Sequence, residues 1–221
     1  MLKNTKDTIS EVLLISANAL EKNSNYFCII DSKFGDGDHG ITIEKIADKI
    51  RLCVKNWEDE TFYEFTNHLG FEIMQVNGGS AGPLWGTLFQ GFSLAFKDED
   101  TMTPQQLKKG FREALREMRD LTPADIGDKT MMDTLIPAVE ASDAAKEEIL
   151  LILTSIEQGG KAGMEATKSF TAKYGRAKSY GEQTIGTPDA GAVSLYLFFK
   201  GLLEGYYKTK GIPIYENEEV Y

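Results

Sequence analysis

Apolar residues recur three and four positions apart along most of this chain, which is the spacing of helices that bury one face. The first such segment, residues 3–23, places Ile9, Val12 and Leu20 on one stripe. The same spacing predicts seven more helices, at residues 43–54, 62–74, 84–96, 104–121, 131–139, 144–174 and 190–207. Only residues 28–30 could form a short strand. The pattern therefore predicts an all-α protein in which eight antiparallel helices form an up-down bundle or a closed barrel.

One helix start and one chain boundary stand out in this pattern. Thr103, Pro104 and Gln106 form a start signal: the hydroxyl caps the helix, proline suits the first turn, and glutamine reaches back to the cap. After residue 210 the chain becomes rich in acidic residues. The sequence contains no internal repeat and no linker. We therefore expect one helical domain at residues 1–210 and an acidic C-terminal tail at residues 211–221.

Residues 31–40 read Asp-Ser-Lys-Phe-Gly-Asp-Gly-Asp-His-Gly and place the carboxylates of Asp31, Asp36 and Asp38 among glycines. Glycine permits tight turns, and carboxylates crowded in one turn repel each other unless a cation lies between them. Oxygen ligands without cysteine favour Mg²⁺ or Ca²⁺ over zinc. Counted from Asp31 or from Asp36, the segment fails the ligand pattern of an EF-hand. We therefore favour Mg²⁺ shared with a nucleotide, with an ordinary Asp/Gly turn as the alternative.

Four segments with functional character lie between the predicted helices, at residues 31–42, 77–83, 122–131 and 175–192. In an up-down bundle, the loops that follow odd-numbered helices share one end. These four segments follow the first, third, fifth and seventh predicted helices. We therefore expect all of them to meet at one rim of the bundle.

The segment at residues 77–83 reads Asn-Gly-Gly-Ser-Ala-Gly-Pro. It opens a helix with unhindered backbone N–H groups and a hydroxyl, an arrangement that binds phosphate, although a flexible turn is equally compatible. It is not a P-loop, because no lysine follows its last glycine. Residues 127–130, Gly-Asp-Lys-Thr, end like a P-loop, but Thr122 stands where the first glycine is required. Any phosphate site here is therefore built differently from a P-loop.

Two further candidates depend on their context. His39 could act as a general base, donate to phosphate or cap the following helix, and we favour contact with the nucleotide. Residues 175–192 supply basic and acidic groups ahead of the last helix, with an ordinary solvated loop as the alternative.

The composition indicates which classes of partner and which cellular compartment to expect. The net charge of −10, from 34 acidic and 24 basic residues, leaves no basic face for a phosphate backbone, so we expect no nucleic-acid partner. Cys28 and Cys53 lie in apolar surroundings, which is typical of buried free thiols in a reduced compartment. No signal peptide and no uncharged run long enough to span a membrane is present, so we expect a cytoplasmic protein without membrane association.

Taken together, the motifs resemble the nucleotide-binding L subunit (DhaL) of bacterial dihydroxyacetone kinases. The matching stretches are Gly-Asp-Gly-Asp-His-Gly at residues 35–40, Gly-Gly-Ser-Ala-Gly-Pro at 78–83, Gly-Asp-Lys-Thr-Met at 127–131, Gly-Arg-Ala at 175–177 with Gly-Glu at 181–182, and Asp-Ala-Gly-Ala at 189–192. Their order and spacing agree over essentially the whole chain.

The resemblance implies an eight-helix antiparallel barrel that binds ADP or ATP at one end. It implies two Mg²⁺ ions held by Asp31, Asp36 and Asp38. The nucleotide contacts that it implies are His39, Gly40, Ile41, Thr42, Gly79, Ser80, Ala81, Met131, Gln183, Ala190, Gly191 and Ala192.

The chain departs from the family pattern in the nucleotide pocket. Ser80-Ala81 replaces Ala-Ser, Gln183 replaces arginine after Glu182, and Ala190 replaces proline after the aspartate. The three metal-binding aspartates are intact.

The implied function is that of the phosphoryl-donor subunit of a dihydroxyacetone (or related small ketose) kinase. In the family the sugar is bound on a separate K subunit, and the spent ADP is recharged in place by an M-like phosphotransferase-system protein or exchanged for ATP. The competing interpretation is a catalytically silent, nucleotide-sensing regulatory module that binds another protein. Retention of all three aspartates favours the enzyme.

Overall fold

The computed structural model describes residues 5–98 and 101–213. These residues form nine α-helices and three 3₁₀ segments, with no strand among them. The α-helices are α1 (Thr5–Lys22), α2 (Ser24–Asp31), α3 (His39–Asn56), α4 (Phe62–Met74), α5 (Ala81–Ser93), α6 (Pro104–Leu121), α7 (Met132–Ala144), α8 (Ile149–Ala166) and α9 (Ala190–Lys210). The 3₁₀ segments are η1 (Leu94–Phe96), η2 (Thr167–Ser169) and η3 (Arg176–Thr184).

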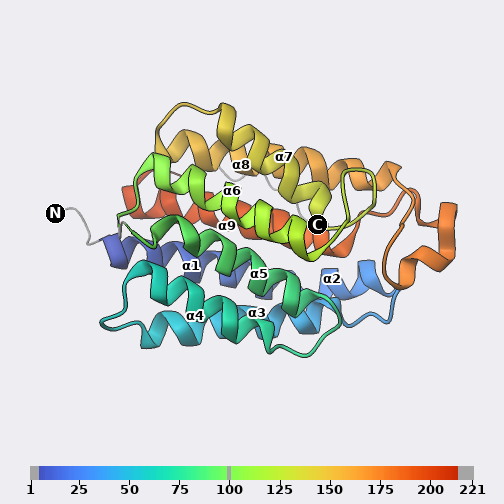
Figure 1. Cartoon of the computed structure of the whole chain (residues 1–221). Coiled ribbons are helices and arrows are strands. Elements are labelled where there is room, and N and C mark those ends of the chain that lie inside the picture. The colour runs from blue at the N-terminus through green and yellow to red at the C-terminus, as the bar shows by residue number, and fades with distance from the viewer. Residues whose placement is uncertain (1–4, 99–100, 214–221) are drawn as a thin grey trace.

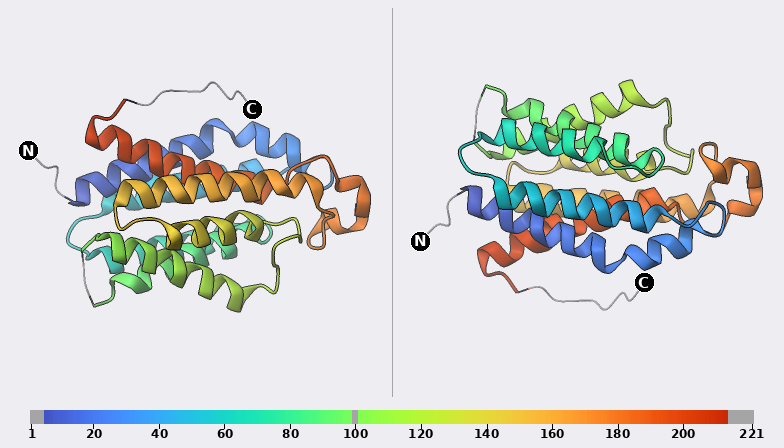
Figure 2. Two further views of the ribbon diagram at one scale, coloured as in Figure 1. Left: turned by 90° about the horizontal axis from the view of Figure 1, so that it is seen from above. Right: turned by 90° about the horizontal axis from the view of Figure 1, so that it is seen from below.

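The eight longer helices form a closed antiparallel ring. Apart from the short α2, consecutive helices run in opposite directions, and each packs against the next one along the chain (Figure 1). The last helix, α9, packs against α1 and closes the ring. Two further views show that the axes of the helices are nearly aligned and that η3 projects from one end (Figure 2). The predicted all-α, eight-helix barrel is therefore confirmed.

The prediction of a strand at residues 28–30 was wrong, because this segment belongs to α2. Phe27 and Ile30, three residues apart, are both buried, whereas Ile29 is 51% exposed. A short apolar run does not by itself distinguish a strand from one buried helical stripe. The eight predicted helices are therefore joined by a ninth, which delivers the first residue of the acidic stretch, Asp31, to the rim.

Several helix ends differ from the prediction. Helices α3 and α5 begin at His39 and Ala81, so several candidate site residues lie in first helical turns rather than in loops. The helix predicted at residues 131–139 extends to Ala144 as α7, and the one predicted at residues 144–174 begins later and ends earlier, as α8 from Ile149 to Ala166. The threonine cap and the first-turn proline of α6 are confirmed: Thr103 Oγ1 accepts a hydrogen bond from the Gln106 backbone N–H at 3.1 Å, and Pro104 is the first residue of the helix.

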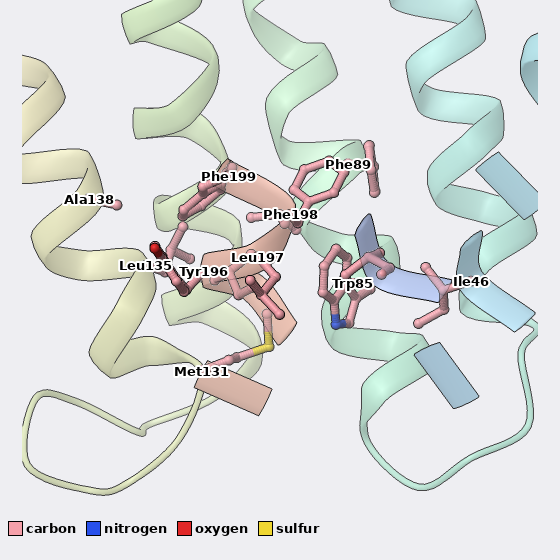
Figure 3. Packing of buried hydrophobic residues seen from close by; sticks show 14 of the residues in the cluster. Ile46, Trp85, Phe89, Met131, Leu135, Ala138, Tyr196, Leu197, Phe198 and Phe199 are labelled. Carbon is pink, nitrogen blue, oxygen red and sulfur yellow. The ribbon is translucent and has the colours of Figure 1, made fainter. Parts of the chain in front are cut away.

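The core fills the interior of the ring. Trp85, Leu135, Phe198 and Phe199 point inward from α5, α7 and α9 (Figure 3). The Trp85 and Phe198 rings meet edge to face, with 5.3 Å between their centroids. At the end where α1 begins and α9 finishes, an apolar cavity of about 370 Å³ opens between side chains such as Phe62, Phe92, Leu107 and Tyr206. This cavity lies at the opposite end of the barrel from the four candidate segments.

Three other expectations meet the structure here. Cys53 is buried as expected, Cys28 is half-buried rather than buried, and both are free thiols. Among the described residues, no helix has both the length and the apolar character that crossing a bilayer requires. Residues 1–4 and 214–221 lie outside the described residues, so the division into a domain and an acidic tail stays a prediction.

Candidate functional site

The four segments with functional character meet at one end of the barrel. Helices α4, α6 and α8 finish at this end, where α2 also lies, and α3, α5, α7 and α9 begin there (right in Figure 1). The arrangement follows from the alternating helix directions, as the order of the predicted helices indicates. We call this end the rim.

An acidic cluster lies at the rim between α2 and α3. Asp31 is the last residue of α2, and Asp36 and Asp38 follow in the connecting loop. Carboxylate oxygens from the three residues lie within 4.8 Å of one another. The loop is closed by a hydrogen bond from the Asp38 backbone N–H to Asp31 Oδ2 at 3.1 Å. It also contains Gly37 at a φ of 74°, a conformation that favours glycine.

The cluster fits a hard divalent cation. Asp36 and Asp38 are exposed and Asp31 is half-buried, so a ligand can reach their oxygens from solvent. Three carboxylates this close are repelled by one another, and a cation relieves that repulsion. Mg²⁺ binds a few carboxylates together with waters and phosphate oxygens, which matches an open cluster with oxygen ligands only.

Arg176 contacts this cluster from the other side. Its guanidinium forms an ion pair with the Asp36 carboxylate. Nearby, the rings of Phe34 and Tyr180 meet edge to face at 5.3 Å. Segment η3 therefore lies against the acidic loop. Arg176 was not among the predicted site residues, because sequence spacing shows the basic groups of this segment but not which of them faces the aspartates.

His39 links α3 to α9. Its Nε2 lies 3.0 Å from Ser194 Oγ, and that hydroxyl donates to the Gly191 carbonyl at 3.0 Å. Burial lowers the pKa of His39 to about 4, although the Asp31 carboxylate and a hydrogen bond with the Ala190 backbone raise it. The ring is therefore neutral at neutral pH. The contacts define a role that the sequence did not suggest, a polar link between the starts of α3 and α9, whereas the expected contact of His39 with the nucleotide stays a prediction.

The glycine-rich segment before α5 packs on the first turn of α3. A Cβ added at Gly78 would lie 2.0 Å from Thr42 Oγ1, so no side chain fits at that position. Gly79 follows at a φ of 59°. Ser80, at the N-terminus of α5, is exposed and its side chain makes no capping hydrogen bond in the described structure. Because Gly78 lies against Thr42, the Ser80 hydroxyl and the adjoining backbone N–H groups lie at the rim near the start of α3, and such groups at a helix N-terminus can bind phosphate oxygens.

A buried aspartate closes the loop before α7. Asp133 accepts hydrogen bonds from the backbone N–H groups of Gly127 at 2.6 Å and Thr130 at 2.7 Å. Burial raises its pKa despite these hydrogen bonds. This loop delivers Met131, which is buried at the start of α7. Asp133 was missed because an acidic residue inside a helical pattern is ordinarily solvent-exposed.

The segment before α9 is organised by a helix cap. Asp189 Oδ2 accepts a hydrogen bond from the Ala192 backbone N–H at 2.8 Å. Burial raises the pKa of Asp189 to about 7. A Cβ added at Gly191 would lie 3.5 Å from Met131 Cβ, so the starts of α7 and α9 are close together. The Ala192 N–H is used by this cap and is not free for phosphate.

The predicted nucleotide-binding residues thus gather at the rim at different depths. Four are exposed: Ile41, Gly79, Ser80 and Gln183. His39 and Gly191 are half-buried. The others are buried, namely Gly40, Thr42, Ala81, Met131, Ala190 and Ala192. In this structure the exposed residues can touch a ligand directly, whereas the buried ones shape the surface beneath it.

Comparisons with known proteins agree with this architecture. The profile of the DAK2 domain family matches residues 33–204. The ADP-binding subunit DhaL of the PEP-dependent dihydroxyacetone kinase of Escherichia coli (strain K12) is 28% identical over 182 residues, covering 81% of this chain and 87% of that protein. A probable dihydroxyacetone kinase of Dictyostelium discoideum is 28% identical over 217 residues and matches 91% of this chain. This chain spans only 33% of the length of the Dictyostelium protein.

Solved structures show the same fold. The native dihydroxyacetone kinase of C. freundii superposes with a TM-score of 0.72 at 23% identity, covering 92% of this chain and 35% of that one. Its complex with AMP-PNP and Mg²⁺ superposes with a TM-score of 0.68 at 24% identity, covering 88% and 33%. The family profile extends from the loop that holds Asp36 and Asp38 through most of α9, and it confirms the family that the motifs indicate. This chain belongs to the DAK2 domain family.

Proposed function

We propose that this chain is the phosphoryl-donor subunit of a dihydroxyacetone (or related small ketose) kinase, and that it binds ADP or ATP with two Mg²⁺ ions at the rim. The proposal rests on one observation: three carboxylates lie within 4.8 Å of one another at the rim, between the end of α2 and the start of α3. Two comparisons support it. The Escherichia coli relative is named as an ADP-binding subunit, and the C. freundii enzyme was solved with AMP-PNP and Mg²⁺.

The rim residues would divide the work of phosphoryl transfer. Asp31, Asp36 and Asp38 would hold the Mg²⁺ ions, which neutralise charge on the phosphate oxygens when bound. The Ser80 hydroxyl and the N–H groups at the start of α5 would orient the phosphates. Arg176, already beside Asp36, would add positive charge at the edge of the cluster. Positioning and electrostatics of this kind supply most of the catalysis in phosphoryl transfer.

We propose that the sugar is bound by a separate K-like subunit that covers the rim. Three large apolar side chains at the rim are exposed: Ile41, Ile126 and Ile185 are each at least 50% accessible. Exposed apolar groups around a polar site suit a protein partner.

Two routes of recharging fit this proposal. The spent ADP could be phosphorylated in place by an M-like protein of the phosphotransferase system, or it could exchange for ATP. A cytoplasmic location is proposed from the two free thiols, which persist in a reducing compartment.

The purified chain alone is not expected to phosphorylate dihydroxyacetone, because in this proposal the sugar is bound by the K-like subunit. Activity should appear when a K-like subunit is added. The measurement is formation of dihydroxyacetone phosphate with each protein alone and with both together. Sugar-dependent ATP consumption by the pure chain would overturn the division of labour. Nucleotide binding without transfer in any combination would favour the regulatory module.

Gln183→Arg is expected to strengthen Mg·ADP binding. A charge-assisted contact contributes about 1.5 to 3 kcal/mol, whereas a neutral one contributes about 0.5 to 1.5 kcal/mol. The difference of about 1 to 2 kcal/mol amounts to about 5-fold to 30-fold in affinity. Calorimetric titration of both proteins measures it, with Gln183→Glu as a control that should weaken binding. Equal affinities in the wild type and Gln183→Arg would show that this exposed side chain does not reach the phosphates or that Arg176 already supplies the charge.

A further inference from the structure

Lys129 combines two unfavourable features at one residue. Its φ of 60° makes it the one non-glycine residue with a positive φ among the described residues. Its side chain is also buried, with 5% of the residue exposed. A left-handed backbone is strained for a residue with a Cβ, and a buried ammonium is unfavourable unless it is well paired. Both features persist only where the surrounding structure determines them.

The Lys129 ammonium joins two distant points of the chain. Its Nζ donates hydrogen bonds to the carbonyl oxygens of Thr167 at 2.5 Å and Thr187 at 2.6 Å. Thr167 begins η2, directly after α8, and Thr187 lies shortly before α9. The segment between them, residues 167–187, includes η3 and projects from the rim (orange in Figure 1). We call this segment the arm. Lys129 therefore holds both ends of the arm together.

The neighbouring residue anchors the arm as well. The Asp128 carboxylate accepts a hydrogen bond from Lys173 Nζ at 2.6 Å, and the Asp128 backbone carbonyl accepts one from the Lys173 backbone N–H at 3.2 Å. A further hydrogen bond, from the Asp189 backbone N–H to Thr167 Oγ1 at 3.0 Å, connects the first residue of the arm to the N-cap of α9. The base of the arm is thus attached to the loop before α7.

The outer part of the arm lies against the acidic cluster. Arg176 forms its ion pair with Asp36, and Tyr180 packs on Phe34. Anything that fixes the base of the arm therefore also fixes the place of Arg176. Asp133 and Asp189 are the acidic groups whose charges favour the ammonium form of Lys129, against the effect of burial.

We propose that Lys129 is a positioning residue: through the carbonyls of Thr167 and Thr187 it fixes the base of the arm and holds Arg176 over the acidic cluster. The anchoring of the arm is argued from the hydrogen bonds and the ion pair given above and does not require that the protein binds a nucleotide. The effect on nucleotide binding rests on the proposed function.

Lys108 provides a matched control. It is also buried, and its Nζ also donates to two backbone carbonyls, those of Asp143 at 3.2 Å and Ala145 at 2.5 Å. Those carbonyls lie at the end of α7, on the opposite side of the barrel from the rim. Removing either ammonium takes away the same kind of interaction. Of these two lysines, only Lys129 contacts the arm.

The first test is amide hydrogen exchange on the full chain. In Lys129→Met, peptides from the arm are expected to exchange at least about tenfold faster, because their closing hydrogen bonds open more often. Peptides from α4 should keep the wild-type rate. Lys129→Gly deletes the ammonium and removes the backbone strain, so it keeps the test valid if the methionine variant folds poorly. In Lys108→Met the arm should exchange as in the wild type. Unchanged arm exchange in both Lys129 variants would overturn the proposal.

The second test is a double-mutant cycle on Mg·ADP affinity. Lys129→Met should weaken binding about tenfold in the wild type but less than twofold in an Arg176→Ala background, because Lys129 acts through Arg176. Equal losses in the two backgrounds would contradict a positioning role. If the wild type binds no Mg·ADP, the proposed function fails, and hydrogen exchange alone decides whether Lys129 anchors the arm.

Discussion

Asp38→Asn is expected to abolish phosphoryl transfer while the barrel stays folded. The substitution removes one of three carboxylates that would share Mg²⁺. It leaves in place the hydrogen bond from the backbone N–H of residue 38 to Asp31 and the ion pair between Arg176 and Asp36. Loss of metal-based charge stabilisation amounts to several kcal/mol, so transfer should fall at least about 100-fold. The rate of dihydroxyacetone phosphate formation with a K-like subunit measures this fall.

The same variant is expected to lose activity but to gain stability. Without metal, Asp38→Asn relieves repulsion within the acidic cluster and should stabilise the protein by up to about 1 kcal/mol. Asp59→Asn is the control, because Asp59 is an exposed acid in the connection between α3 and α4, at the other end of the barrel. It should change neither transfer nor stability appreciably. Near-normal turnover by Asp38→Asn would show that phosphoryl transfer does not depend on Mg²⁺ held by these aspartates.

Gly40→Ala is expected to destabilise the protein, although alanine ordinarily favours a helix. A Cβ at Gly40 would lie 1.8 Å from the Ser24 carbonyl oxygen and 2.7 Å from Cys28 Sγ. Helices α2 and α3 would have to separate, which would also move Asp31 away from Asp38. Overpacking of this kind costs about 1 to 3 kcal/mol and exceeds the helix-propensity gain of about 1 kcal/mol. After this gain is subtracted, the free energy of unfolding in urea should fall by up to about 2 kcal/mol.

Gly79→Ala is the matched control for that substitution. Nothing lies within 4 Å of a Cβ at Gly79, and its φ of +59° leaves only the strain of a left-handed alanine, about 1 kcal/mol. Metal binding should be impaired in Gly40→Ala beyond what its stability explains, because the acidic cluster spans the α2–α3 junction. A Gly40→Ala protein as stable as the wild type would show that the two helices can move apart freely.

The helical barrel could be predicted from sequence because its signals are local or additive. The 3–4 spacing of apolar residues predicts each long helix, and Thr103 with Pro104 predicts the start of α6. The order of the helices then predicts that four separate segments share one end. Helix α2 could not be predicted, because it has only eight residues and two buried side chains, Phe27 and Ile30. A segment this short does not show a recognisable helical repeat.

The candidate site could be predicted only where the signal lies within one segment. Asp31, Asp36 and Asp38 are close in sequence, so their shared turn predicts their proximity. Arg176 and Lys129 depend on contacts across the fold: one reaches Asp36 from a 3₁₀ segment, and the other reaches carbonyls 38 and 58 residues away. No pattern of residue types near Lys129 indicates which carbonyls its side chain will find.

The central claim is that the rim binds a nucleotide through Mg²⁺ held by the acidic cluster. Calorimetric titration of ADP into the purified chain, with Mg²⁺ and then with EDTA, tests this claim most directly. We predict one bound nucleotide per chain with Mg²⁺, and loss of that binding in EDTA and in Asp38→Asn. Absence of binding with Mg²⁺, or equal binding in EDTA and in the variant, would contradict the account.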